Sequence, residues 1–164
     1  MRSSNEARRI IKLAESLKLV AYLCPAGVWT IGWGHTRNVH QGQTFTVAEA
    51  EKFLSMDIAV VEMALNQLFC TINLTQGQFD ALTSFVFNVK LSEFRVSTMY
   101  RMLMADSSNP AIALQFGRWK FGGDGSHNGR DDDGDGSVDE AGEKQSLAGL
   151  LTRRQMEAVL FQKK

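Results

Sequence analysis

Residues 15–35 read ESLKLVAYLCPAGVWTIGWGH, and this stretch decides the fold. Before it, apolar residues recur at helical spacing, so we predict a helix over residues 5–19 with Asn5 as its N-cap. Within it, Pro25 and three glycines interrupt β-branched and aromatic residues, which is typical of short twisted strands and turns. A small sheet over residues 21–40 is therefore expected directly after the first helix.

The rest of the sequence favours helices. Thr46 and Glu49 form a capping-box pattern before an amphipathic segment over residues 47–69. Thr75 precedes a strongly apolar segment, residues 76–87, which predicts a buried helix. Further short helices are expected over residues 97–104, 110–119 and 152–161. This order indicates an α+β domain with its strands gathered near the N-terminus.

Length and composition indicate a globular domain. The chain has 164 residues, of which 44% are hydrophobic and 22% charged, enough for one domain with a core. No apolar run approaches the roughly 20 residues of a membrane helix, so no stable membrane insertion is expected. Residues 1–10 are polar and show no signal peptide. Cys24 and Cys70 are too few for a disulfide framework.

The formal net charge of zero conceals two oppositely charged parts. Residues 124–143 hold eight acids and one base, a net charge of −7. The remaining residues hold 17 bases and 10 acids, a net charge of +7. Such asymmetry within one domain favours two different partners, a cation for the acidic segment and an anionic cell wall for the body. No nucleic-acid partner is expected.

The spacing of three polar residues carries the functional signal. Eight residues separate Glu15 from Cys24, and five more separate Cys24 from Thr30. Taken singly, these residues would be a solvated helix-end carboxylate, an inert buried thiol and a plain strand threonine. Together with the run Thr-Ile-Gly-Trp-Gly-His at 30–35, they resemble the phage-type lysozymes, the endolysins of glycoside hydrolase family 24.

The resemblance covers about residues 5–123 and 146–161. It implies one lysozyme-like domain over residues 1–164, with a small sheet-bearing lobe, a larger helical lobe and a cleft between them. About residues 1–68 would form the small lobe and the interlobe helical segment, and about 69–164 the helical lobe, with the insertion at 124–143. Lys90 stands where the family usually has glycine, so we expect that loop to be rebuilt locally.

The implied activity is hydrolysis of the β-1,4 bond between N-acetylmuramic acid and N-acetylglucosamine in bacterial peptidoglycan. Glu15 is predicted to be the general acid, since desolvation where helix meets sheet would raise the pKa of its carboxyl. Cys24 and Thr30 would position the attacking water, and the resemblance implies inversion of configuration. Because a thiol is a weak hydrogen-bonding group, the arrangement would depend on Thr30 and water placement.

Two further residues are predicted to bind substrate. The resemblance implies that Arg154 faces Glu15, although a solvated helix charge is an equal alternative for Arg154. His35 is expected in a structural or cleft-wall role, since three histidines without ligand spacing do not indicate a metal site. The protein is expected to act as a monomer on glycan strands in the periplasm or cell wall, after synthesis in the host cytoplasm, without a cofactor for catalysis.

Two alternatives stay open on the sequence. A lytic transglycosylase would cleave the same bond without a hydrolytic water and leave anhydro-sugar ends. An inactive wall-binding or calcium-responsive module would bind cell walls without releasing fragments. The complete register of Glu15, Cys24 and Thr30 argues against the inactive module.

The acidic insertion resembles the calcium loops of EF-hand-like proteins. Aspartates occupy positions one, three, five and nine of the loop, and glycine occupies position six. Position twelve is Gly142, so Glu140 or Glu143 would have to supply the bidentate carboxylate. A solvated acidic loop is the alternative, and Mg²⁺ suits so flexible a loop poorly. The predicted ligands of a structural Ca²⁺ are Asp131, Asp133, Asp135, Ser137, Asp139 and Glu140.

Overall fold

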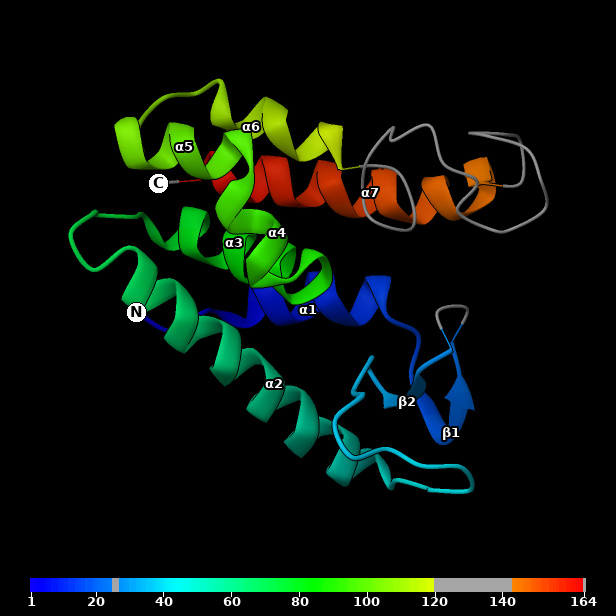
Figure 1. Cartoon of the computed structure of the whole chain (residues 1–164). Coiled ribbons are helices and arrows are strands. Elements are labelled where there is room, and N and C mark those ends of the chain that lie inside the picture. Colours follow the sequence, from blue (N-terminus) through cyan, green and yellow to red (C-terminus); the bar gives the residue numbers. More distant parts are fainter. Residues whose placement is uncertain (25–26, 120–142, 164) are drawn as a thin grey trace.

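The computed structural model describes residues 1–24, 27–119 and 143–163. Among these residues, helices make up most of the molecule, and one small antiparallel sheet lies at one end of it, beyond the end of α1 (Figure 1). The elements in chain order are α1 (Asn5–Ala14), β1 (Lys18–Leu23), β2 (Trp29–Gly32), α2 (Val47–Leu68), α3 (Gln76–Val89), α4 (Leu91–Val96), α5 (Thr98–Ala105), α6 (Ile112–Gln115), the 3-10 helix η1 (Phe116–Arg118) and α7 (Glu143–Phe161). The predicted α+β class, with strands near the N-terminus, is confirmed.

The first helix is shorter than predicted. It begins after Ser4, whose hydroxyl caps it by accepting from the N–H of Glu6, so Asn5 is not the cap. It ends at Ala14, because Glu15 has an extended backbone. The chain then enters β1, which pairs antiparallel with β2. The predicted helix 5–19 was wrong over residues 15–19: Leu17 follows Ala14 at helical spacing, but Leu19 and Ala21 are two residues apart and form the half-buried face of β1.

Helix α2 links two hydrophobic clusters. Its N-terminus carries the predicted capping box of Thr46 and Glu49. Its first half packs with the sheet region in a small cluster of Ile11, Ile31, Trp33, Phe45, Ala50, Leu54 and Ile58. Leu65, near its other end, belongs to a larger cluster among the remaining helices. The described residues thus hold two hydrophobic clusters, one beside the sheet and one among the helices.

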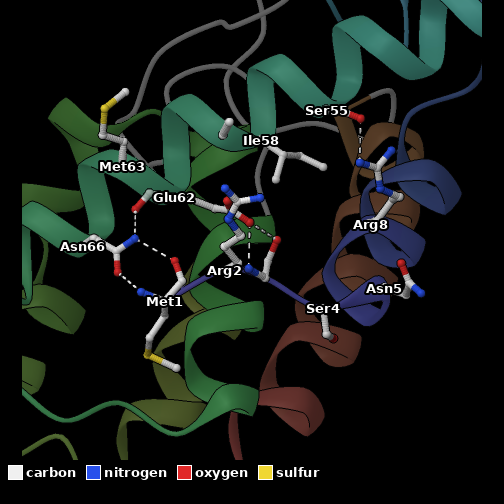
Figure 2. Close-up of a pocket in the computed structure, with 12 residues that line it drawn as sticks. Met1, Arg2, Ser4, Asn5, Arg8, Ser55, Ile58, Glu62, Met63 and Asn66 are labelled. Carbon is white, nitrogen blue, oxygen red and sulfur yellow. Dashed lines mark hydrogen bonds between the residues drawn. The ribbon is translucent and has the colours of Figure 1, made fainter.

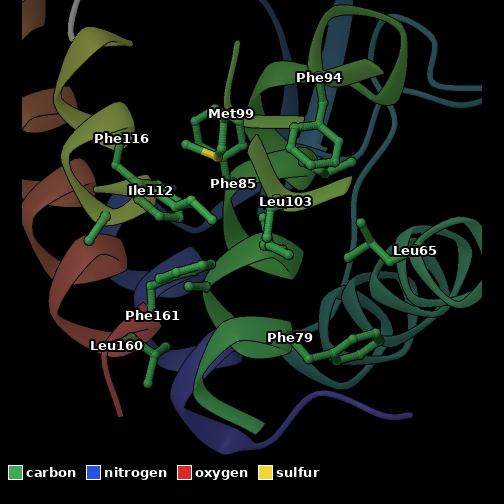
Figure 3. Close-up of a cluster of buried hydrophobic side chains, with 14 of the residues drawn as sticks. Leu65, Phe79, Phe85, Phe94, Met99, Leu103, Ile112, Phe116, Leu160 and Phe161 are labelled. Atoms are coloured by element: carbon green, nitrogen blue, oxygen red, sulfur yellow. The ribbon is translucent and has the colours of Figure 1, made fainter. Parts of the chain in front are cut away.

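The larger cluster surrounds α3, which is buried over most of its length. Phe85 lies at its centre and makes edge-to-face contacts with Phe94, Phe116 and Trp119. Figure 3 shows how side chains from α3, α5, α6 and α7 fill this space. Helix α3 also packs against α1 and α7, and α1 and α7 pack against each other. The three helices therefore form one packed unit, which fixes the end of α1 next to the sheet.

Lys90 joins α3 to α4 and keeps a positive φ of 74° with ψ of 148°. The expected local rebuilding of this loop is therefore wrong: the backbone keeps a conformation that L-residues rarely adopt, with lysine in place of glycine. The N–H of Lys90 donates to the Val86 carbonyl at the end of α3, and the carbonyl of Lys90 accepts from the N–H of Phe94. These two bonds fix the conformation of the junction.

The N-terminal residues are anchored to α2 and α3. Ser3 donates from both its N–H and its hydroxyl to Glu62, while Ser4 donates likewise to Asp80. A cavity of about 590 Å³ lies beside this segment and is lined by residues 1–4, α1 and α2; Figure 2 shows the side chains around it. None of the residues predicted to act on substrate lines this cavity. In the part of the chain described, no helix is long and apolar enough to cross a membrane.

Candidate active site

Helix α1 leads directly into β1 (Figure 1), and Glu15 is the residue that ends α1. Its N–H still donates to the Ile11 carbonyl at 2.8 Å, so the last helical turn fixes the backbone. Its side chain is 28% exposed. Gly34 passes close to the carboxylate with φ of 83°, and a Cβ there would lie 3.4 Å from Oε2. The positive φ therefore favours glycine at this position, whereas a Cβ there would make only ordinary van der Waals contact with the carboxylate.

The positively charged side chain that contacts Glu15 belongs to Arg153 of α7. Its Nη1 donates to Glu15 Oε1 at 2.8 Å, and its side chain is only 2% exposed. The expectation that Arg154 faces Glu15 is therefore wrong: its neighbour Arg153 makes this contact. Consecutive helix residues project about 100° apart, so Arg153 makes the direct contact, while Arg154 is close enough to feel the charge of Glu15 but is hydrogen-bonded to other groups.

Arg154 lies in the interior instead. It donates from Nε to the Trp119 carbonyl at 3.0 Å and makes close bonds to Glu157 and Asn88. Burial lowers the pKa of its guanidinium below the ordinary value, and the Glu157 carboxylate opposes that shift. Its guanidinium also lies 4.7 Å from the Phe85 ring centroid. Arg154 is thus neither the solvated helix charge nor the partner of Glu15.

Glu157 connects the two arginines. It is fully buried, and its Oε1 accepts from Arg153 Nε at 3.1 Å and from the Ser84 hydroxyl at 2.7 Å. Its Oε2 accepts from Arg154. Arg153 Nη2 donates to the Ser84 carbonyl at 2.8 Å. A continuous polar network therefore runs from the interior of the helical lobe to Glu15.

The hairpin places Tyr22, Cys24 and Thr30 on the sheet side of Glu15. Tyr22 pairs with Thr30 in the β1–β2 register. Burial raises the pKa of Tyr22, and the negative charges of Glu15 and Cys24 raise it further. Tyr22 therefore interacts electrostatically with both Glu15 and Cys24. Cys24 itself is partly buried.

Thr30 is 5% exposed, and its hydroxyl donates to the Val28 carbonyl at 3.0 Å. The same carbonyl accepts from the N–H of Cys24 at 3.0 Å. This shared acceptor ties the two residues to one turn. To hold a water, the Thr30 hydroxyl would either use its lone pairs or turn its proton away from Val28.

His35 is buried, with 7% exposure, and its Nδ1 lies 2.8 Å from Asp57 Oδ2 on α2. Its ring packs on Phe53 at a centroid distance of 4.6 Å. Its backbone pairs with Ile31 in both directions. His35 therefore fastens the end of the sheet to α2, which fits the structural half of the predicted role.

Sequence reasoning assigned no role to Tyr22, Arg153 or Glu157. For the last two a signal was available, because an arginine and a glutamate four residues apart share one face of α7. For Tyr22 no signal was available in the sequence. Its pairing with Thr30 depends on the register of β1 and β2, which follows from the position of the hairpin turn.

The predicted calcium ligands lie outside the described residues. Within the ranges that are described, no cluster of three or more histidine, cysteine, aspartate or glutamate side chains is arranged to hold a metal ion. The calcium site therefore stays a prediction from the sequence.

Comparison with known proteins identifies the family. Residues 12–134 match the phage lysozyme family. The endolysin of Acyrthosiphon pisum secondary endosymbiont phage 1 is 36% identical over 162 residues, covering 99% of both chains, and that of Salmonella phage P22 is 37% identical over 126 residues, covering 74% of this chain and 84% of the relative. The muramidase domain of SpmX from Asticaccaulis excentricus superposes with a TM-score of 0.78 at 30% identity, covering 99% of both chains.

The chain therefore belongs to the phage lysozyme family. It is a lysozyme, an enzyme that hydrolyses peptidoglycan, as the sequence predicted. Its lysozyme-like fold is confirmed by the same solved structure.

Proposed function

We propose that Glu15 is the general acid of this lysozyme. It would protonate the leaving glycosidic oxygen between N-acetylmuramic acid and N-acetylglucosamine, while water attacks the anomeric carbon. The observation that supports the assignment is the hydrogen bond from buried Arg153, which orients the carboxylate at the boundary between sheet and helices. A carboxyl held in one orientation is what proton transfer to a bound sugar requires.

We propose that Cys24 and Thr30 position the attacking water. Their support is their place on one hairpin, where the Thr30 hydroxyl and the Cys24 N–H both donate to the Val28 carbonyl. In this arrangement Cys24→Asp keeps substantial activity because a carboxylate binds the same water, whereas Cys24→Ala loses most of it. Equal activity of the two variants, with both folded, would refute the role of Cys24.

Product analysis tests the reaction itself. Purified peptidoglycan is digested and the new chain ends are examined by mass spectrometry. Hydrolysis gives reducing N-acetylmuramic acid ends that incorporate one ¹⁸O from labelled water. Anhydro-sugar ends without label would instead identify a lytic transglycosylase, and wall binding without soluble fragments would identify an inactive module.

We infer that the protein acts on the cell wall as a monomer, after synthesis in the host cytoplasm. The support for the site of action is family membership, and the net charge of +7 outside the insertion suits an anionic wall. Sedimentation equilibrium tests the monomer directly, since a dimer would double the mass of 18.2 kDa.

We further propose that the insertion binds one structural Ca²⁺, on the grounds of its sequence alone. Its aspartates alternate in the calcium-loop pattern and would repel one another without a cation. The melting temperature should therefore rise with Ca²⁺ and fall with chelator. Identical melting temperatures under the two conditions would refute the site.

A further inference from the structure

The fully buried carboxylate of Glu157 has no part in the chemistry proposed above, yet a single side chain, that of Arg153, connects it to Glu15. We propose that Glu157 is a positioning residue, which fixes the guanidinium of Arg153 so that Arg153 in turn fixes Glu15. This proposal rests on the proposed role of Glu15 as general acid. It assigns Glu157 an effect on turnover rather than on folding alone.

The geometry of Arg153 carries the first step. All three guanidinium nitrogens are engaged: Nε on Glu157 at 3.1 Å, Nη2 on the Ser84 carbonyl at 2.8 Å, and Nη1 on Glu15 at 2.8 Å. A guanidinium is planar, so two fixed contacts determine where the third N–H points. Glu157 and Ser84 therefore set the direction from which Glu15 is held.

The position of Glu157 carries the second step. Its Oε1 is held by the Ser84 hydroxyl at 2.7 Å as well as by Arg153, and its Oε2 is held by Arg154. Ser84 lies on α3 and Glu157 on α7, so the carboxylate joins two packed helices. It cannot shift without breaking one of these bonds.

Charge balance carries the third step. The network contains two buried guanidinium groups, Arg153 and Arg154, and two carboxylates, Glu15 and Glu157. Without the charge of Glu157, both arginines would compete for Glu15 as the remaining carboxylate of the network. The bond from Arg153 to Glu15 would then lose its fixed direction, since buried charges rearrange to find partners.

The test is Glu157→Gln, which preserves the shape of the side chain and removes its charge. Soluble glycan strands serve as substrate, and kcat and KM are measured below the melting temperature of every variant. We expect kcat to fall about tenfold to a hundredfold, because small displacements of a catalytic group have effects of this size. KM should change by less than about twofold, since Glu157 is buried away from substrate.

Asp80→Asn is the matched control. Asp80 is also a buried carboxylate on α3, but it holds the Ser4 cap of α1 and has no bond to the network of Glu157. This variant should lose stability and keep the wild-type kcat. If Glu157→Gln has the wild-type kcat, as Asp80→Asn is expected to have, Glu157 is a structural residue and the proposal is wrong.

A second variant decides the matter if Glu157→Gln does not fold. Ser84→Ala removes only the hydroxyl bond to Oε1 and leaves both charges in place, so it should lower kcat in the same direction by about threefold to tenfold. An unchanged kcat in Ser84→Ala would overturn the proposal in that case.

The background variant Glu15→Gln separates this proposal from the proposed function. If Glu15→Gln is inactive and Glu157→Gln lowers kcat in the wild-type background only, both assignments stand. If Glu15→Gln is inactive but Glu157→Gln behaves like Asp80→Asn, only the positioning role fails. If Glu15→Gln keeps its activity, the proposed general acid is wrong, whatever Glu157 does.

Discussion

Arg153 and Glu15 are 138 positions apart in the sequence and form a hydrogen-bonded ion pair of 2.8 Å. The contact joins the last helix to the end of the first, beside the sheet. It places a buried cation against the carboxylate to which the sequence assigns the proton transfer. The guanidinium geometry therefore matters as much as the charge.

Arg153→Lys tests that geometry. A lysine keeps the positive charge but offers one flexible donor centre, which cannot serve Glu15, Glu157 and the Ser84 carbonyl in the same fixed plane. We expect kcat on soluble glycan strands to fall at least tenfold in a folded protein. Arg101→Lys, which alters an exposed arginine of α5, is the control and should have wild-type kinetics. Full activity of Arg153→Lys would show that charge alone suffices.

Lys90→Gly should stabilise the protein. A non-glycine residue with φ of 74° and ψ of 148° costs about 1–3 kcal/mol of backbone strain, which exceeds the extra entropy that glycine loses on folding. The melting temperature should rise by about 2–4 °C for a chain of this length. Asn38→Gly is the control: asparagine tolerates its φ of 56° well, so the gain there should be smaller. A lower melting temperature of Lys90→Gly would contradict the strain argument.

Asp57→Asn tests the role of His35. The substitution weakens the 2.8 Å contact to a histidine that is buried among aromatic rings, so the melting temperature should fall by several degrees. KM, measured well below the melting temperature, should stay at the wild-type value because the pair fastens the sheet region to α2. A raised KM without loss of stability would instead support the predicted contact of His35 with substrate.

Tyr22 gives the stability a pH dependence at alkaline pH. Partial burial and the charges of Glu15 and Cys24 raise its pKa above the ordinary value of 10.0 in the folded protein, although solvent screens much of this effect because Tyr22 is 40% exposed. Its contribution to stability is therefore present below about pH 10 and is lost as the pH rises through the raised pKa. The melting temperature should fall more steeply above pH 10 in the wild type than in Tyr22→Phe. Parallel curves would contradict this.

The same tyrosine reports on Glu15. In Glu15→Gln one of the neighbouring negative charges is gone, so the pKa of Tyr22 should move down toward its ordinary value. The phenolate absorbance difference between each protein and its Tyr22→Phe counterpart isolates this titration.

Local signals in the sequence predicted most of the fold. The capping box at Thr46 and the N-cap threonine at position 75 predicted the first residues of α2 and α3 correctly, because such capping signals are confined to a few neighbouring positions. The end of α1 was missed, because Leu17 continues the helical spacing from Ala14, while the strand spacing begins only at Leu19 and Ala21. Lys90 was misjudged because the helices on either side hold it in a strained conformation that its own preference opposes.

The site was predicted in part for the same reason. The spacing of Glu15, Cys24 and Thr30 is local, and a resemblance could carry it onto this chain. The contact between Glu15 and Arg153 depends on the rotation of α7 about its axis, which tertiary packing decides. One residue of error in that rotation exchanges Arg153 for Arg154, and no local pattern distinguishes the two.

Glu15→Gln, assayed on purified peptidoglycan beside the wild type, tests the central claim most directly. The amide keeps the size of the side chain and can still accept from Arg153, but it cannot protonate the leaving oxygen. We predict a folded protein whose release of new reducing ends is slower by about 10²–10⁴-fold. Release within tenfold of the wild-type rate by a folded Glu15→Gln protein would contradict the assignment of Glu15 as the general acid.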